Sequence, residues 1–334
     1  MASYMITMRT QDGGDTPSPT ARYLKLDDTG AETELVKTLW EAQIIAQFPK
    51  AADDTRHGDI IVFVHGFNVD FQSAVAAHHK MAKAAADNGF LGQFISFDWP
   101  SKGLVFAYLS DREHARLAAN ALVTSGISLL RDAQTQNCRI NLHVMAHSMG
   151  CFVVQQAFIW SYQDVPPDWR VGQLILVAAD VDATVFSADT PTAKAFAAHA
   201  GRLTAYCNRS DKALAVSNAK RLELAARMGR VGLPDDAPAS MCEVDCSELF
   251  DKALPSVADH LAIVKTHGFY FDQPVFWQDV VLTLAGGIDR GFMPTRQVNA
   301  PNTPDNRFRI RTAAIPAADY AGALAKAAQS PSFG

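Results

Sequence analysis

Four short runs of apolar and β-branched residues constrain the fold of this chain more than any other feature of its sequence. The runs are Ile60–His65, Gln93–Asp98, Ile140–Ala146 and Gln173–Asp180. They are continuously apolar and do not alternate, as expected for strands of a parallel sheet that is covered by helices on both faces. Segments with helical spacing separate them, at residues 71–88, 112–137 and 151–162. This order predicts a doubly wound α/β fold.

The flanking regions extend the same pattern. Further strands are expected at residues 4–9, 22–25 and 202–208 and, more weakly, at 241–247; further helices are expected at residues 32–48, 211–228 and 274–285. Prolines and asparagines then become frequent after Gly291. We therefore expect a main domain over residues 1–291 and a C-terminal extension over 292–334, which packs on the domain or contacts another subunit in a homo-oligomer.

Composition narrows the class of protein. Of the 334 residues, 48% are hydrophobic and 19% charged, which suits a globular core and excludes a disordered chain. The formal net charge is −5 with no long run of like charge, so nucleic acid is not an expected partner. No apolar stretch approaches the roughly 20 residues that a membrane-spanning helix needs. Residues 1–14 lack the features of a secretory signal, so we expect a cytoplasmic protein.

Neither a metal site nor a cofactor is expected. The five cysteines are odd in number and scattered, as is typical of reduced buried thiols: Cys138, Cys151, Cys207, Cys242 and Cys246. The last two have a C-x3-C spacing that suits a bridge or half of a metal site, but no second Cys/His pair completes a zinc set. His143 and His147 fall on a strand and a turn, not on one helical face, so they do not form a helical metal pair.

The segment Ile140–Phe158 carries the clearest chemical signal. A predicted strand runs into the sequence AHSMG, with Ser148 at its centre, and then directly into a helix. A serine at such a tight turn adopts a strained backbone, so the residues two before and two after it must be small, here Ala146 and Gly150. The helix N-terminus that follows offers backbone N–H groups, beginning with that of Met149, and a partial positive charge to an oxyanion. This context predicts a nucleophile elbow.

An oxyanion hole of this kind needs a second donor from a loop that follows an earlier strand. His65-Gly66-Phe67-Asn68 directly follows a predicted strand. Gly66 would let the backbone turn so that the N–H of Phe67 points at the same oxygen. The predicted oxyanion hole therefore consists of the N–H groups of Phe67 and Met149, and each such donor is typically worth about 3 kcal/mol in the transition state.

Six blocks in this order resemble the α/β-hydrolase superfamily, and more narrowly a bacterial group of largely uncharacterised serine hydrolases: VFVHGFN, FDWPS, AHSMG, AADVDATVF, NRSDKAL and THGFYF. The resemblance covers about residues 59–286. It implies a mostly parallel sheet of about eight strands with helices on both faces, and a catalytic serine, acid and histidine in that order. The segments 184–201 and 212–240 are long enough to form a small partial cap.

The acid must follow a late strand and fix the tautomer of the histidine. Asp211 fits best, because it lies a few residues beyond the strand expected at 202–208; its rivals are Asp180 and, less well placed, Asp182. Asp211 could also simply cap the helix that starts there.

The expected base is His267, which lies in the THGFYF block before the last helix of the main domain. His260 and His199 fit the order less well. The residues expected around the substrate are His65, Gly66, Asn68, Trp99 and His147, and Phe186, Phe196, Phe269 and Phe271 could supply apolar contacts to an acyl group.

Together these residues predict a serine esterase without a cofactor, acting on a small-molecule carboxylic ester through an acyl-enzyme. A thioesterase, lipase, amidase or acyltransferase would use the same apparatus, so the motif does not separate them. A catalytically silent binding protein with this fold is the alternative from a different class.

Overall fold

The structure is a computed structural model. It describes residues 3–11, 14, 17–52, 54–101, 108–132, 138–162, 169–214, 226–255, 266–298 and 304–328. Two compact units divide the chain. The first comprises residues 1–83 and 91–171, and the second comprises residues 84–90 and 172–334.

The first unit is built on six strands in the order β6-β4-β5-β1-β2-β3. Their bounds are Ser3–Arg9 (β1), Pro17–Leu26 (β2), Glu32–Leu35 (β3), Arg56–Val64 (β4), Gln93–Asp98 (β5) and Cys138–His147 (β6). Strand β4 pairs in parallel with both β5 and β6, and β5 pairs in parallel with β1. The second half of β4 is fully buried, which explains its continuous apolar run.

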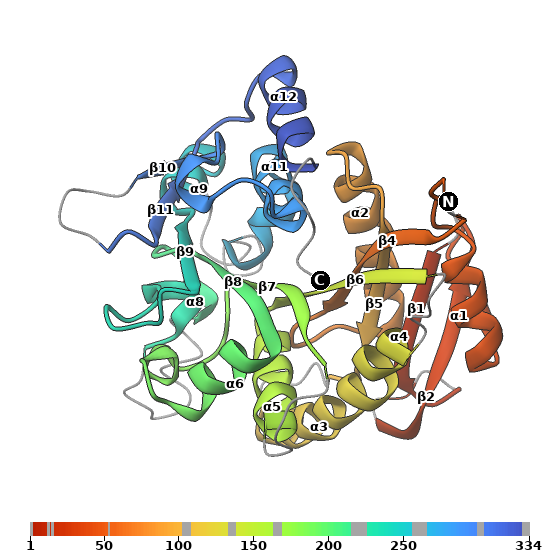
Figure 1. Cartoon of the computed structure of the whole chain (residues 1–334). Helices are drawn as coiled ribbons and strands as arrows, with labels where there is room; N and C mark the ends of the chain where they lie inside the picture. The colour runs from red at the N-terminus through yellow and green to blue at the C-terminus, as the bar shows by residue number, and fades with distance from the viewer. Residues whose placement is uncertain are drawn as a thin grey trace. The chain divides into compact units, whose positions relative to one another are not determined.

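Helices cover this sheet. They are α1 (Lys37–Ile45), α2 (Phe71–Asp87), α3 (Tyr108–Ala121), the π-helix η2 (Leu122–Ile127), α4 (Ser128–Asp132) and α5 (Gly150–Tyr162). Figure 1 shows α2 on one side of the strands and α3 and α5, which pack together, on the other. Most of α5 is buried, including both Phe152 and Phe158. The sheet of this unit is therefore a central layer, as its apolar runs predict.

The second unit holds five strands in the order β10-β11-β9-β8-β7. They are β7 (Val171–Val177), β8 (Ala200–Cys207), β9 (Met241–Asp245), β10 (Arg296–Val298) and β11 (Arg307–Ile310). Strands β8, β9 and β11 pair in parallel, and β10 closes the edge antiparallel to β11.

The helices of the second unit are η3 (Ala183–Phe186), α6 (Pro191–His199), α8 (Met228–Val231), α9 (Ser247–Ala253), η4 (Phe269–Asp272), α11 (Pro274–Ala285), η5 (Arg290–Phe292) and α12 (Ala317–Ala328). Helix α6 joins β7 to β8 and packs on β8. In Figure 1, α6 and α11 lie on opposite sides of these strands. The segment 184–201, expected as part of a cap, thus consists of η3, α6 and the first residues of β8. Much of the other expected cap segment, residues 215–225, lies outside the described residues.

The prediction of one helix over residues 32–48 is wrong in its first part. Residues Glu32–Leu35 form β3, which pairs antiparallel with β2, and the helix begins only at Lys37. A tight turn makes this hairpin: the Asp27 carboxylate accepts hydrogen bonds from the N–H groups of Thr29 and Ala31, and Gly30 takes a positive φ of 84°. Arg22 then pairs across the hairpin with Glu34 at 2.9 Å. Tertiary pairing overrides local propensity here.

Two other helix predictions also need correction. The helix expected over residues 112–137 is interrupted by the π-helical turn Leu122–Ile127 and is described as far as Asp132, while residues 133–137 lie outside the described residues. The helix expected over residues 211–228 does not reach Met228 as one element, because Arg227 forms an isolated antiparallel bridge with Asp182 and α8 begins afterwards.

The expected C-terminal extension contributes regular structure to the second unit. Its strand β11 pairs in parallel with β9, and α12 packs on α11 through Leu324 and Ala327. The two units together hold eleven strands among the described residues, more than the eight or so expected, because β3, β10 and β11 are short strands at or next to an edge and have little apolar signal.

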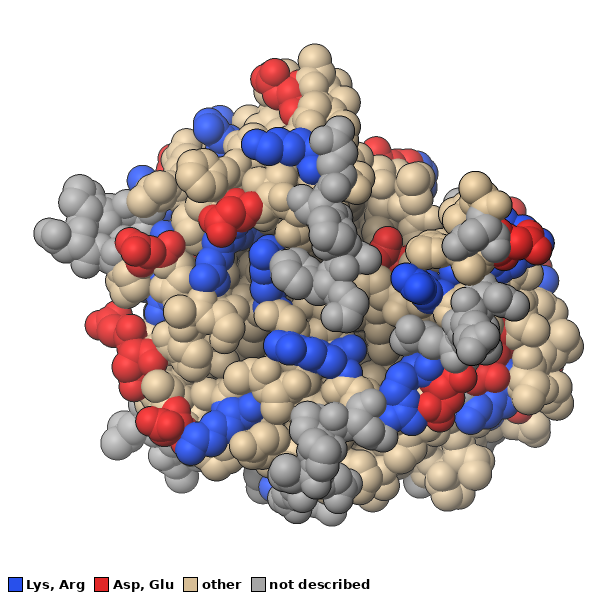
Figure 2. Space-filling model, viewed as in Figure 1, with Lys and Arg blue, Asp and Glu red and all other residues tan. Residues whose placement is uncertain are grey.

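The surface carries both signs of charge. Figure 2 shows Lys and Arg side chains interspersed with Asp and Glu on the face drawn, in keeping with the small net charge of −5. Within the described ranges, no helix has the length and apolar character to cross a bilayer.

Candidate active site

Ser148 occupies a strained turn between β6 and α5. Its φ is +55°, in the left-handed region that residues with a side chain seldom adopt. The strand ends at His147 and the helix begins at Gly150, so only Ser148 and Met149 lie between them. Such strain persists only where the surrounding structure enforces it, and it is concentrated at functional sites. The serine is 7% exposed.

Close backbone packing enforces this turn. A Cβ atom on Gly150 would lie 2.3 Å from the carbonyl oxygen of Val64 and 2.5 Å from that of His65, so only glycine fits. A Cβ on Gly66 would lie 2.8 Å from the Cβ of Ser148. The end of β4 and the loop after it therefore lie directly against the turn that carries Ser148.

Helix α5 starts immediately after the serine. The N–H groups of Cys151 and Phe152 donate to the carbonyls of Ser148 and Met149, which closes the first turn. The whole helix is thirteen residues long, and the N-terminus of such a helix carries about half a positive charge. An anion formed next to Ser148 would lie beside this positive end.

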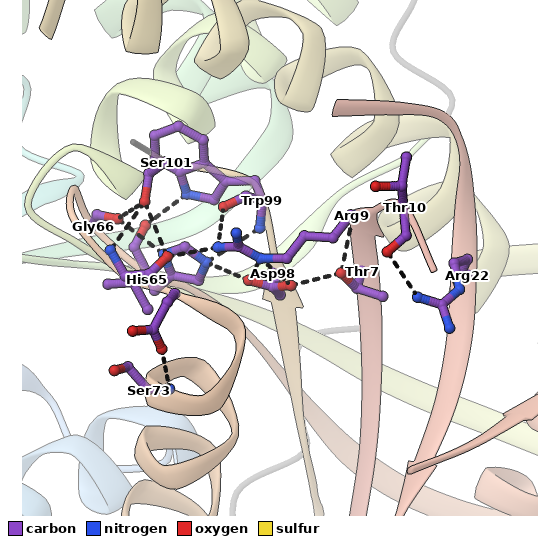
Figure 3. Close-up of polar contacts among 12 residues, drawn as sticks. Thr7, Arg9, Thr10, Arg22, His65, Gly66, Ser73, Asp98, Trp99 and Ser101 are labelled. Atoms are coloured by element: carbon purple, nitrogen blue, oxygen red, sulfur yellow. Dashed lines mark hydrogen bonds and ion pairs between the residues drawn. The ribbon is translucent and has the colours of Figure 1, made fainter. Parts of the chain in front are cut away.

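The loop His65–Val69 follows β4 in the same unit. His65 and Gly66 are buried, Phe67 is half-buried and Asn68 is exposed. Asn68 has a φ of +58°, so this loop contains a second residue in the left-handed region. Trp99 is fully buried; its indole N–H donates to the carbonyl of His65 at 2.8 Å, and its ring stacks on the imidazole. Figure 3 shows these contacts.

A fully buried carboxylate, Asp98, lies beneath this loop. It accepts hydrogen bonds from the hydroxyl of Thr7 at 2.6 Å and from the Nε of Arg9 at 3.0 Å, and its Oδ1 lies 3.0 Å from the Nε2 of His65. Burial alone would raise the pKa of Asp98, but the hydrogen bond from His65, the charges of His65 and Arg9 and the Thr7 hydroxyl together lower it. The group therefore stays ionised in the interior.

The second unit brings Asp211 and His267 together. The Nδ1 of His267 donates to Oδ2 of Asp211 at 2.8 Å, and the N–H of Leu214 donates to the other carboxylate oxygen at 3.0 Å. Asp211 thus caps a helical turn and binds the imidazole at once. It is completely buried, and the side chain of His267 is 16% exposed.

Electrostatics favour the protonated form of His267. Burial alone would lower the pKa of this imidazole, but the charge and hydrogen bond of Asp211, with a smaller contribution from Asp180, raise it on balance. Because Nδ1 donates to the carboxylate, the other nitrogen, Nε2, is the proton acceptor of the neutral ring.

The alternative acids and bases have other surroundings. Asp180 forms an ion pair with Arg227 at 3.4 Å, and Asp182 accepts the N–H of Thr184 at the start of η3. His199 is completely buried at the end of α6. His260 lies outside the described residues.

The phenylalanines expected to contact an acyl group contribute to the second unit. Phe186, Phe196 and Phe269 are buried, and the first two pack against each other with ring centroids 5.9 Å apart. The five cysteines, all among the described residues, are buried thiols without disulfide bonds. No cluster of three or more potential metal ligands occurs in the part of the chain that the structure describes.

Sequence reasoning missed Thr7 and Arg9 altogether. A signal existed: Thr7 and Arg9 are two polar residues, spaced two apart, at the end of a largely apolar strand. In the sheet Thr7 pairs in register with Asp98. Side chains in register on adjacent strands share a face, so a buried threonine, arginine and aspartate had to meet.

Comparison with known proteins relates this chain to a family and to a cyanobacterial protein. Residues 41–271, more than half of the chain, match the family described as alpha/beta hydrolase of unknown function (DUF900). An uncharacterized protein of Nostoc sp. (strain PCC 7120), alr1448, is 32% identical over 117 residues. That match covers 28% of this chain and 29% of the Nostoc protein.

The family match confirms the predicted fold class, a mostly parallel sheet with helices on both faces, and indicates hydrolase activity. The strained serine between strand and helix agrees with it. This chain belongs to the alpha/beta hydrolase family of unknown function (DUF900).

Proposed function

We propose that this protein is a serine hydrolase that cleaves carboxylic esters through an acyl-enzyme intermediate. Ser148 is the nucleophile, His267 is the general base and acid, and Asp211 orients His267. The N–H groups of Phe67 and Met149 form the oxyanion hole, and no cofactor takes part.

The observation that carries the proposal is the backbone of Ser148. A serine with a φ of +55°, packed against Gly66, has no evident structural advantage over glycine or asparagine at the same turn. The strain has a clear use if the turn presents a hydroxyl to a substrate. The hydrogen bond between Asp211 and His267 supports the base and acid of the proposal.

In the proposed reaction, the Oγ of Ser148 attacks the ester carbonyl while Nε2 of His267 accepts the hydroxyl proton. The carbonyl π electrons move to oxygen, and the resulting oxyanion accepts hydrogen bonds from the two backbone N–H groups. Collapse expels the alcohol, which takes the proton from His267. Water then attacks the acyl-enzyme by the same route and releases the acid and the free serine.

The charge on the imidazolium is what Asp211 stabilises. The carboxylate is completely buried and keeps one oxygen on Nδ1 of the ring, so it fixes both the tautomer and the ring orientation. The proposal requires Nε2 to reach the hydroxyl of Ser148, and the activity of variants tests this requirement.

Hydrolysis of p-nitrophenyl esters, from acetyl to longer acyl chains, is the primary test. Replacement of Ser148 by alanine should lower kcat by about a millionfold, since the nucleophile and base act as a unit. Ser73→Ala removes an exposed serine of α2 in the same unit and should leave kcat unchanged. Wild-type activity in Ser148→Ala would refute the proposal, as would a folded wild-type protein that hydrolyses none of these esters.

A further inference from the structure

The loop His65–Val69 and the end of β5 are held together by a set of contacts that includes none of the proposed catalytic residues (Figure 3). The carbonyl of Val69 accepts a hydrogen bond from the Nη2 of Arg9 at 2.6 Å. The N–H of Val69 donates to the hydroxyl of Ser101 at 3.1 Å. At the other end of the loop, the Nε2 of His65 lies 3.0 Å from Asp98 and 3.1 Å from the N–H of Trp99.

One ion pair reaches both ends of this loop. Arg9 and Asp98 are in contact at 3.0 Å, and their side chains are 1% and 0% exposed. Asp98 holds the imidazole of His65, the first residue of the loop, and Arg9 holds the carbonyl of Val69, the last. Because both charges are buried, neither side chain can leave its partner at low cost.

The imidazole of His65 carries this contact into the loop backbone. Its Nδ1 lies 2.9 Å from the carbonyl oxygen of Gly66, and its Nε2 faces the Asp98 carboxylate. Each ring nitrogen therefore contacts an oxygen atom, and Nε2 also accepts a hydrogen bond from the N–H of Trp99 at 3.1 Å. The imidazole of His65 thus links the Asp98 carboxylate to the carbonyl of Gly66, the residue that precedes Phe67.

Burying the Arg9–Asp98 ion pair costs free energy, because both charges lose their contact with water. Apolar side chains of the same volume would avoid this cost. A buried ion pair is useful where its hydrogen bonds hold a segment of the backbone in one conformation. The segment here includes Asn68 in the left-handed conformation, with a φ of +58°, and Phe67, whose N–H the proposed oxyanion hole uses.

We infer that Arg9 and Asp98, with Ser101, are positioning residues that clamp the loop His65–Val69 and so fix the direction of the Phe67 N–H. Their effect on turnover rests on the proposed function; their effect on the loop does not. They touch no substrate and act through the loop backbone.

Two variants test the clamp in the full-length protein. Ser101→Ala removes the acceptor of the Val69 N–H with a small change in volume, and Asp98→Asn removes the buried charge. The control is Asp279→Asn, since Asp279 is an equally buried aspartate that pairs with Arg296 in the second unit. The readouts are amide hydrogen exchange in residues 65–70, and kcat and KM with a p-nitrophenyl ester.

We expect exchange in residues 65–70 to rise about tenfold in both loop variants and to stay unchanged in the control. We expect kcat to fall by about 10- to 100-fold in the loop variants, less than for loss of a whole oxyanion donor, with KM within about twofold. A trifluoromethyl ketone, whose adduct carries an oxyanion, should bind more weakly by a factor similar to the loss in kcat.

The outcomes separate the inference from the proposed function. Unchanged exchange in both loop variants overturns the clamp, whatever the activity. Faster exchange with unchanged kcat overturns the positioning role, because the loop is then loosened without effect on turnover. If wild type hydrolyses no ester but exchange rises in both variants, the proposed function fails and the clamp stands. If Asp98→Asn does not fold, Ser101→Ala alone decides.

Discussion

Asp98 in the first unit and Asp279 in the second have almost the same surroundings. Each is fully buried, accepts a 2.6 Å hydrogen bond from a threonine hydroxyl, and pairs with the Nε of an arginine at 2.8 to 3.0 Å. Each also contacts a polar atom of a ring side chain, which is an imidazole nitrogen for Asp98 and a phenol hydroxyl for Asp279. The partners are Thr7, Arg9 and His65 for Asp98, and Thr295, Arg296 and Tyr206 for Asp279.

The two networks differ in what they reach next. Arg9 continues to the carbonyl of Val69 in the loop after β4. Arg296 instead returns to the hydroxyl of Thr283, on the same helix as Asp279, at 2.7 Å. The first network therefore ends on the backbone of the loop that the proposed oxyanion hole uses, and the second ends within the core. The role of a buried ion pair therefore depends on which other groups its two side chains bind by hydrogen bonds.

Asp211 extends this comparison, because its ring partner is the proposed base itself. Asp211→Asn should lower kcat by about 10⁴, since an amide favours the wrong tautomer of His267. Asp180→Asn, which alters the rival acid, should change kcat by less than about tenfold. Steady-state hydrolysis of a p-nitrophenyl ester measures both. A large loss in Asp180→Asn together with near-normal activity in Asp211→Asn would exchange the two roles.

Replacement of the arginine in each network tests whether the two ion pairs contribute equally to the free energy of unfolding. Arg9→Met and Arg296→Met each strand a buried carboxylate, so each should lower the free energy of unfolding by about 3–5 kcal/mol. Urea denaturation measures this loss. Only Arg9→Met should also lower kcat per folded molecule. An equal loss of kcat in Arg296→Met would end the distinction between the networks.

A milder pair of variants sharpens the same contrast. Thr7→Val and Thr295→Val each delete one hydroxyl that donates to a buried carboxylate, at a cost of about 1–2 kcal/mol in stability. Thr7→Val should lower kcat about threefold, because Asp98 then holds His65 less firmly, whereas Thr295→Val should not. The kinetics are compared at a temperature where both variants are fully folded. A threefold loss in Thr295→Val alone would contradict the assignment.

The pH dependence of turnover gives the smallest expected effect. His267 must be neutral to accept a proton, so kcat/KM should rise with pH through an inflection above the ordinary histidine value of 6.5. The charge of Asp180 contributes to the raised pKa of His267, so Asp180→Asn should move this inflection to lower pH. An inflection that moves upward, or that lies below 6.5 in wild type, would contradict this electrostatic picture.

The same shift has a consequence for stability. A histidine whose pKa is raised on folding stabilises the protein fully below its unfolded value of 6.5, and this contribution is lost as pH rises through the folded value. The free energy of unfolding of wild type should therefore decrease over that interval relative to His267→Gln.

The sequence predicts the parts of the fold that local pattern determines. Strands β4, β5, β6 and β7 follow from their apolar runs, and the turn at Ser148 follows from small residues between a strand and a helix. The resemblance to the α/β-hydrolase superfamily implies that Asp211 and His267 are partners, and their hydrogen bond spans 56 positions of the chain.

Pairings between distant segments explain what was missed. β3 is a strand because β2 lies beside it, and β11 is a strand because β9 does; neither segment is apolar enough to predict alone. The contact of Arg9 with Asp98 spans 89 positions and depends on the register of β1 with β5. Local periodicity carries no information about such registers.

Labelling with a fluorophosphonate probe tests most directly whether Ser148 is an activated nucleophile. We predict one adduct per folded molecule, located by mass spectrometry on the peptide that contains Ser148 and formed at least about a thousandfold more slowly in His267→Ala. A folded wild-type protein without an adduct, or with one on another serine, would contradict the proposed chemistry.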